Sequence, residues 1–141
     1  FVSLIHSVDS QRLADEIERQ AQKIQREIPI LIEVNMGREE SKFGFLEEEV
    51  LPFLKQVETY QFVKIMGLMT SAPYVEDSEQ NSKIFHKMKQ LSVDIEAENI
   101  DNVSMEWLSM GMSNDYQVAI REGSNMVRIG TGIFGMRNYL I

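Results

Sequence analysis

The run SMGMSNDYQVAIREGSNMVRIGTGIFGMRNY, from Ser109 to Tyr139, indicates the fold more clearly than any other part of the chain. The apolar segment 104–109 leads into it as a β-strand, and residues 113–115 are suited to cap a helix that we expect over 115–121. A second buried strand is expected over 126–129, before a glycine-rich turn. A strand, a helix and a strand in this order predict the last unit of a parallel α/β protein.

The turn Gly130-Thr131-Gly132 is suited to hold an anion. A further helix is expected to start here, which would direct backbone N–H groups and the local dipole at whatever lies above the end of the strand. Arg128 lies on the strand face opposite Val127 and Ile129, and a charge in an apolar strand is costly unless it is paired. We interpret Arg128 as a ligand contact, because phosphate sites in these folds lie on late strands. The alternative partner is a carboxylate on a neighbouring strand.

Strands and helices alternate along the whole chain. Strands are expected over 2–5, 30–35, 62–69, 105–108 and 126–129, and the helices before 105 over 9–27, 46–59 and 77–98. Asp9 is the expected cap of the first helix, and Pro52 is compatible with the second only if that helix begins late. Five strands separated by helices specify a parallel sheet, because parallel neighbours require crossover connections. A free doubly wound sheet and an arc of a barrel both satisfy this pattern.

Length and composition limit the function. The chain has 141 residues, whereas a (β/α)₈ barrel typically takes about 250 and at least about 200, so the chain is too short to close one. A net charge of −8 and a pI near 4.8 argue against a nucleic-acid partner. The absence of cysteine excludes disulfides and thiolate catalysis. No stretch approaches the roughly 20 apolar residues of a membrane span, so we expect a cytoplasmic protein with no membrane partner.

Several segments carry a resemblance to a known family. LSMGMSNDYQVAI and VRIGTGIFGMR are two of them, and IHSVDS (5–10), LIEVNMGREESKFGF (31–45) and GLMTSAP (67–73) precede them in the family's order. The chain resembles the YggS/PROSC family of pyridoxal 5′-phosphate (PLP) homeostasis proteins, whose fold is similar to the barrel domain of alanine racemase. The resemblance implies α/β architecture with strands four to eight of a (β/α)₈ TIM barrel. Residues 1–141 would form the carboxyl-terminal part of a single PLP-binding barrel domain.

The resemblance also implies site residues. Arg128 would face the pyridine nitrogen of PLP, while Ser113, Gly130 and Thr131 would bind its phosphate through hydroxyl and backbone N–H groups. Ser109 is a further candidate for cofactor binding. A guanidinium stays charged, so it disfavours protonation of the ring nitrogen and makes PLP a poor electron sink. The resemblance therefore favours a noncatalytic carrier or buffer of PLP, with no catalytic residue.

Two other functions stay open. A PLP-dependent amino-acid racemase has a similar barrel but needs a second base, usually a tyrosine from another domain, and neither Tyr116 nor Tyr139 has that context. A PLP-independent barrel enzyme could use the same turn to bind a phosphorylated metabolite. The nine methionines are interpreted as flexible core filling and not as a metal site.

The chain departs from the family in one large respect. The family holds PLP as a Schiff base with a lysine in a segment reading AVSK, followed by a GEN turn and an HxIGxLQxNK strand, and none of the three occurs here. We therefore expect a piece of a longer protein that begins near the fourth strand and keeps the phosphate and ring-nitrogen half of the site. Its unpaired sheet edges and exposed inner face would favour self-association.

Three other polar residues call for an interpretation. His6 ends the first expected strand and is interpreted as a rim histidine bonded to backbone, with a general base as the alternative. His86 is expected on the surface of a helix. Glu33 needs a partner in a buried strand, either Arg128 across the barrel interior or a lysine near the helices.

Two loop motifs have alternative interpretations. In the loop 37–44, Arg38 and Lys42 could draw an anionic ligand, but we favour a polar loop in which Glu39 and Glu40 neutralise them. The glycine of GLMT, residues 67–70, is expected to bring the backbone close to the cofactor pocket or to form a bulge.

Overall fold

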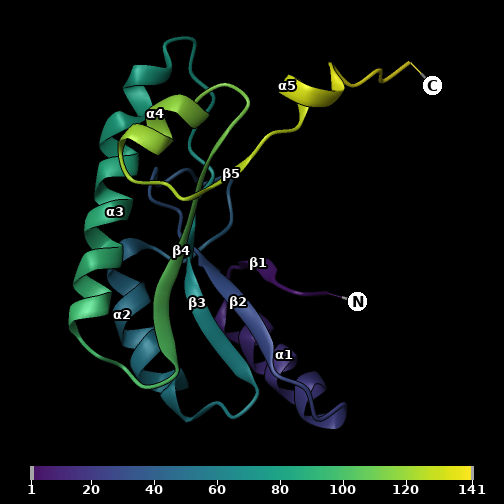
Figure 1. The fold of residues 1–141 in the computed structure, drawn as a ribbon, viewed down its shortest axis with the longest axis vertical. Coiled ribbons are helices and arrows are strands. Elements are labelled where there is room, and N and C mark those ends of the chain that lie inside the picture. Colours follow the sequence, from purple (N-terminus) through teal and green to yellow (C-terminus); the bar gives the residue numbers. More distant parts are fainter. Residues whose placement is uncertain (1, 141) are drawn as a thin grey trace.

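The computed structural model describes residues 2–140, which form one parallel sheet with helices packed against it (Figure 1). The strands are β1 (Ile5–Val8), β2 (Ile28–Glu33), β3 (Val63–Met69), β4 (Val103–Met112) and β5 (Met126–Arg128). The helices are α1 (Gln11–Lys23), α2 (Glu47–Gln56), α3 (Ser82–Ala97), α4 (Tyr116–Arg121) and α5 (Thr131–Phe134), with 3₁₀ turns η1 (Val57–Thr59) and η2 (Ser78–Asn81).

The strands lie in the sheet in chain order, β1-β2-β3-β4-β5, and every neighbouring pair is parallel. A doubly wound sheet reverses its strand order at a switch point, whereas a barrel adds each strand beside the previous one. The order therefore identifies an arc of a barrel, which confirms the fold that the family resemblance implied.

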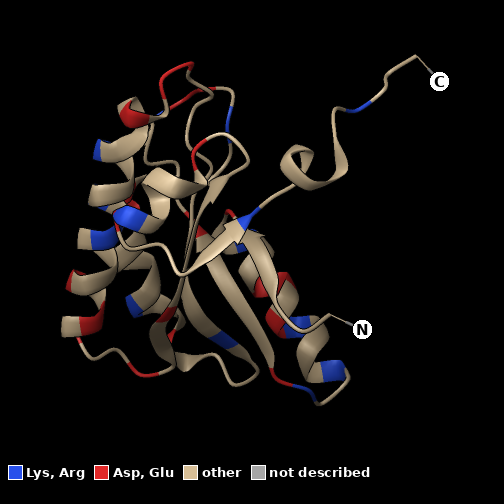
Figure 2. Ribbon diagram, turned by 45° about the horizontal axis from the view of Figure 1, so that its top comes forward, with Lys and Arg blue, Asp and Glu red and all other residues tan. Residues whose placement is uncertain are grey.

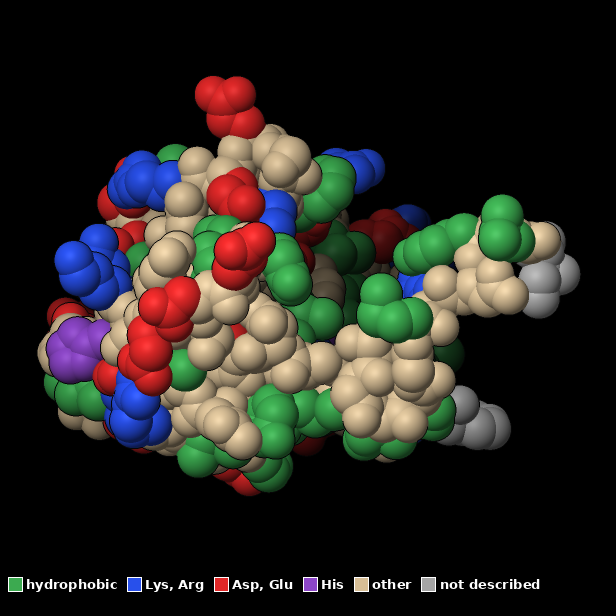
Figure 3. Space-filling view, turned by 90° about the horizontal axis from the view of Figure 1, so that it is seen from above, with side chains coloured by type: hydrophobic (Ala, Val, Ile, Leu, Met, Phe, Trp, Pro, Cys, Tyr) green, Lys and Arg blue, Asp and Glu red, His purple; other side chains and the backbone are tan. Residues whose placement is uncertain are grey.

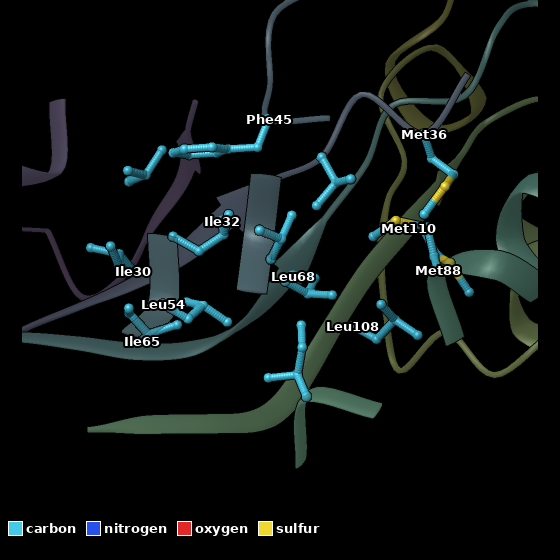
Figure 4. Packing of buried hydrophobic residues seen from close by; sticks show 14 of the residues in the cluster. Ile30, Ile32, Met36, Phe45, Leu54, Ile65, Leu68, Met88, Leu108 and Met110 are labelled. Atoms are coloured by element: carbon cyan, nitrogen blue, oxygen red, sulfur yellow. The ribbon is translucent and has the colours of Figure 1, made fainter. Parts of the chain in front are cut away.

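One hydrophobic core lies between the sheet and helices α1 to α4 (Figure 4). Ile30 and Ile32 of β2 and Ile65 of β3 are at most 1% exposed and contribute alternate positions of their strands. The rings of Phe45 and Phe53 stack with centroids 4.5 Å apart. Right-handed crossovers all turn the same way, so the helices cover one face of the arc.

The residues next to these core positions point to the opposite face, which we call the inner face. Glu33, Met69 and Ser109 follow core residues on β2, β3 and β4, and they are register partners across the three strands. Ser109 is in turn the partner of Met126 on β5. Arg128 lies two residues further along β5 and therefore shares the face of Met126. The inner face thus brings Glu33, Ser109 and Arg128 to the carboxyl ends of the strands.

The start of the chain differs from the sequence prediction. β1 spans Ile5–Val8 and not 2–5, because Ile5 and Val8 are the residues that pair with β2, while Val2 is 55% exposed. The cap of α1 is Ser10, whose Oγ accepts a hydrogen bond from Leu13 N at 3.3 Å. The prediction that Asp9 caps this helix is wrong.

Two further boundaries differ. α2 begins at Glu47, so the prediction that Pro52 requires a late start is wrong. Pro52 leaves the carbonyl of Glu48 without its helical N–H partner, and Glu48 is exposed, so water can satisfy that carbonyl. β4 continues to Met112 through Gly111. The φ of Gly111 is +97°, a value that glycine adopts without strain.

The C-terminal segment projects away from the sheet (Figures 1 and 3). Ile133, Phe134, Met136 and Tyr139 are between 68% and 87% exposed. Apolar side chains gathered in this way on a surface favour association. The expected self-association stays a prediction.

Charged residues of both signs lie on α1 and α3, and along α3 the lysines precede the acidic residues (Figure 2). Within residues 2–140, no helix has the length and apolar character needed to cross a membrane.

Candidate functional site

Arg128, the last residue of β5, reaches across the ends of the neighbouring strands. Its Nη1 donates a hydrogen bond to Ser109 Oγ at 2.5 Å, and its Nη2 donates to the carbonyl of Thr70 at 2.8 Å. Ser71 Oγ lies 3.5 Å from the same Nη2. Ser109 and Thr70 are at most 1% exposed, so both acceptors are held inside the fold. A guanidinium has five N–H donors, so some stay available to a ligand.

Thr70 joins this arginine to the rest of the sheet. Its hydroxyl donates to the carbonyl of Val34 at 2.7 Å, and its N–H donates to the carbonyl of Ser109 at 3.0 Å. The ends of β2 to β5 are therefore joined by one chain of hydrogen bonds. Sequence reasoning quoted Thr70 within GLMT without giving it a role. The signal that could have found it is a polar residue directly after a buried apolar strand.

The turn after β5 directs two backbone N–H groups at one oxygen. Gly130 N and Gly132 N donate to Ser113 Oγ at 3.2 and 3.0 Å. An oxygen atom of a ligand could be bound by the same two donors. A Cβ built on Gly130 would meet nothing within 4 Å, so the turn is open on that side. The structure thus brings Ser113, Gly130 and Thr131 together, whereas Ser109 lies beside Arg128.

The turn that carries Ser113 is fixed by a buried carboxylate. Asp115 Oδ1 accepts from Met112 N at 2.8 Å, and its Oδ2 accepts from Asn81 Nδ2 at 2.9 Å. Asn81 is 1% exposed and also donates to the carbonyl of Pro73 at 2.8 Å. Asp115, within the stretch 113–115 predicted to cap the helix, is the N-cap residue of α4, but its side chain makes no capping hydrogen bond to the helix. It bonds back to β4 instead, because Met112 N lies within its reach.

A cavity of 620 Å³ adjoins the turn, a size that suits a small-molecule ligand. Its walls are formed by residues 71–74, 111–115, 130–131 and 134–137, with Lys42 and Tyr139. Arg128 and Ser109 are not part of these walls. Within residues 2–140 the cavity therefore covers the turn half of the site and stops short of the arginine.

The loop between β2 and α2 is electrically neutralised, as we favoured. Lys42 Nζ lies 2.9 Å from Glu39 Oε2, and it donates to the carbonyls of Ser71 and Ala72 at 3.3 and 3.0 Å. Arg38 pairs with Glu48 of α2 at 2.6 Å. The prediction that Glu39 and Glu40 together neutralise both cations is therefore correct for Glu39 and Lys42 only, because Arg38 pairs with Glu48.

Glu33 lies near Arg128 without joining it. Burial raises the pKa of Glu33 and Asp9 adds to the rise, while Arg128 and Lys42 oppose it. Among residues 2–140, no cation forms an ion pair with Glu33 within 4 Å, so neither predicted pairing is observed. Burial also lowers the pKa of Arg128, and Glu33 counteracts that shift through space.

The two histidines differ in their surroundings. His6 lies within β1 on the inner face, where burial lowers its pKa and nearby Arg128 lowers it further. Its Nδ1 is buried and has no hydrogen-bond partner in the described part of the chain, so the predicted bond to backbone is not seen at that atom. The side chain of His86 is 73% exposed and lies 3.5 Å from Glu122, which confirms its surface position.

A protein-family model described as "Alanine racemase, N-terminal domain" matches residues 2–138. The chain belongs to the alanine racemase N-terminal domain family. Among curated members, the pyridoxal phosphate homeostasis protein of Aquifex aeolicus is 44% identical over 138 residues, which cover 98% of this chain and 60% of that protein. The protein of the same name from Helicobacter pylori is 38% identical over 133 residues, or 94% of this chain and 57% of that protein.

Solved structures of the alanine racemase N-terminal domain family agree with the fold. PipY of Synechococcus elongatus, solved with PLP bound, matches with a TM-score of 0.83 and 28% identity over 94% of this chain and 61% of its own. An alanine racemase from Clostridium difficile matches with a TM-score of 0.72 and 18% identity, over 93% of this chain and 34% of its own, which supports the fold alone. The resemblance to YggS/PROSC proteins and the barrel of alanine racemase type are confirmed. The chain spans about three-fifths of the length of its curated relatives.

Proposed function

We propose that this chain supplies the ring-nitrogen and phosphate half of a PLP site and serves PLP homeostasis as a carrier or buffer. Relatives that share its sequence are named pyridoxal phosphate homeostasis proteins, and PipY is described with PLP bound. One observation in this chain carries the proposal. At the end of β5, hydrogen bonds to Ser109 and Thr70 hold the guanidinium of Arg128. The turn that begins two residues later directs the N–H groups of Gly130 and Gly132 at Ser113 Oγ.

The donor set fits PLP. Gly130 N and Gly132 N, with the hydroxyls of Ser113 and Thr131, are donors suited to the oxygens of a phosphate. A guanidinium such as that of Arg128 suits an unprotonated ring nitrogen, because it donates and stays charged. PLP, when bound, supplies an aldehyde that condenses with amines and a ring that can take up electron density. Arg128 opposes protonation of that ring, which favours a carrier over a catalyst.

The lysine beside the cavity is poorly placed to act as a nucleophile. Lys42 Nζ donates to two backbone carbonyls and lies beside the carboxylate of Glu39. To attack the PLP aldehyde, its nitrogen would have to leave these partners. We therefore propose that binding to residues 1–141 is noncovalent, and that this segment is part of a single barrel domain.

We expect PLP to bind this chain weakly and in competition with inorganic phosphate, because both use the turn after β5. Titration of the chain with PLP, followed by absorbance with and without phosphate, measures this. Borohydride treatment and mass spectrometry should then find no lysine labelled stoichiometrically. One fully labelled lysine would contradict noncovalent binding, and rapid solvent deuterium exchange at Cα of alanine would contradict the carrier role.

Ser113→Ala is expected to weaken the binding of both PLP and inorganic phosphate by about fivefold. The substitution removes a hydroxyl donor and also the acceptor that orders Gly130 N and Gly132 N, each a modest hydrogen bond. Titrations of the original chain and of Ser113→Ala with PLP and with inorganic phosphate measure the effect. Ser3→Ala, at an exposed position outside the site, is the matched control and should bind as the original chain does. Unchanged phosphate affinity in Ser113→Ala would argue against the assigned turn.

A further inference from the structure

Ser109 lies apart from the other residues that the resemblance assigned to the cofactor. Ser113, Gly130 and Thr131 line the cavity, but Ser109 does not, and its hydroxyl accepts a hydrogen bond from Arg128. We propose that Ser109 is a positioning residue that fixes the guanidinium of Arg128 and does not bind phosphate. The inference deepens the proposed function, because it assumes that Arg128 faces the ring of PLP.

Ser109 is itself an immobile acceptor. It is 0% exposed and lies on β4 between Leu108 and Met110, which are both part of the core. Met69 on one side and Met126 on the other are its register partners, and its carbonyl accepts from Thr70 N at 3.0 Å. Because strands pair on both sides of it, the position of its Oγ is set by the sheet and not by a loop.

Arg128 needs such an anchor. β5 has three residues and its register with β4 rests on Ser109↔Met126 and Met112↔Arg128. A long side chain on so short a strand would sample several rotamers without fixed partners. Ser109 Oγ accepts a hydrogen bond from Nη1 at 2.5 Å, and the carbonyl of Thr70 accepts one from Nη2 at 2.8 Å. Two acceptors at different nitrogens fix both the rotation and the plane of the guanidinium.

The consequence for the ligand is directional. With both anchors, the donors of Arg128 that Ser109 and Thr70 do not use point in one fixed direction. Without the Ser109 hydroxyl, Nη1 loses its partner and the guanidinium can turn about its remaining bond to Thr70. Ring binding would weaken because the donor is no longer held in place. Phosphate binding would not change, because the turn 130–132 and Ser113 make no hydrogen bond to Ser109.

Titrations with PLP and with inorganic phosphate separate this role from that of a phosphate ligand. Ser109→Ala should weaken PLP binding about three- to tenfold and leave phosphate binding within about twofold. Ser109→Thr keeps the hydroxyl and should bind PLP as the original chain does, with the melting temperature of each variant as the check on folding. A parallel loss of phosphate affinity in Ser109→Ala, or an equal loss of PLP affinity in Ser109→Thr, would overturn the positioning role.

A measurement without ligand keeps this inference distinct from the proposed function. In ¹⁵N NMR of the arginine side chains, Arg128 should show hindered rotation of its guanidinium in the original chain and faster rotation in Ser109→Ala. Identical Arg128 side-chain spectra in the original chain and in Ser109→Ala would show that Ser109 does not fix the guanidinium. A chain that binds phosphate but not PLP would instead overturn the proposed function, while the NMR comparison would still decide whether Ser109 positions Arg128.

Discussion

Arg128→Ala is expected to weaken PLP binding by about 30-fold, the largest effect on binding of any change proposed for this site. A hydrogen bond to a charged group contributes about 1.5–3 kcal/mol, and each 1.4 kcal/mol is a factor of ten in affinity. The substitution also leaves the hydroxyl of Ser109 and the carbonyl of Thr70 without their charged partner inside the fold. Titration of the variant with PLP, followed by absorbance, measures the loss.

Lys42→Ala is the matched control for this experiment. Lys42 is also a cation and lines the cavity, but its ammonium is already satisfied by Glu39 and by the carbonyls of Ser71 and Ala72. We expect its loss to change PLP affinity by less than about threefold, as for a surface ion pair. Equal losses in the two variants would show that general positive charge, and not the placed guanidinium of Arg128, binds the cofactor.

The strands were predictable where a buried apolar run is long and its ends are unambiguous. The expected strand 62–69 differs from β3 by one residue, because its apolar residues are bounded by polar ones. β4 was predicted too short because Gly111 resembles a strand end. In the structure that glycine adopts a φ of +97° and the strand continues beyond it. A Cβ at this position would lie 2.6 Å from Ala119 Cβ, so close packing of α4 on β4 explains the glycine.

The site was predictable only where its residues are close in sequence. Arg128 and the turn 130–132 are consecutive, and the resemblance added Ser113 from the preceding turn. The contacts of Arg128 with Ser109 and Thr70 could not be predicted in the same way, because they cross two strand pairs. They depend on the register of β5 against β4, which places Ser109 opposite Met126. This register lets the side chain of Arg128 extend back along the strand to Ser109. Local sequence does not specify that register.

Gly67 shows how the close approach of two strands supports this geometry. A Cβ built on Gly67 would lie 1.8 Å from the carbonyl oxygen of Trp107 and 2.7 Å from its carbonyl carbon, and the φ of Gly67 is +152°. The register of β3 against β2 shifts between Ile65 and Leu68, where β3 has one residue more than β2, as in the bulge that we considered for this motif. This shift precedes Thr70, whose carbonyl binds Arg128, on the same strand path.

Gly67→Ala is therefore expected to lower the free energy of unfolding by about 3 kcal/mol or more, a large part of the roughly 5–15 kcal/mol that holds a typical domain. The new methyl group would collide with backbone, which cannot rotate away as a side chain would, so β3 and β4 must separate. Urea unfolding followed by circular dichroism measures the loss. Gly130→Ala is the matched control, because its Cβ would meet nothing within 4 Å and its φ is −106°. An unfolding midpoint in Gly67→Ala equal to that of Gly130→Ala would mean that β3 and β4 can separate at little cost.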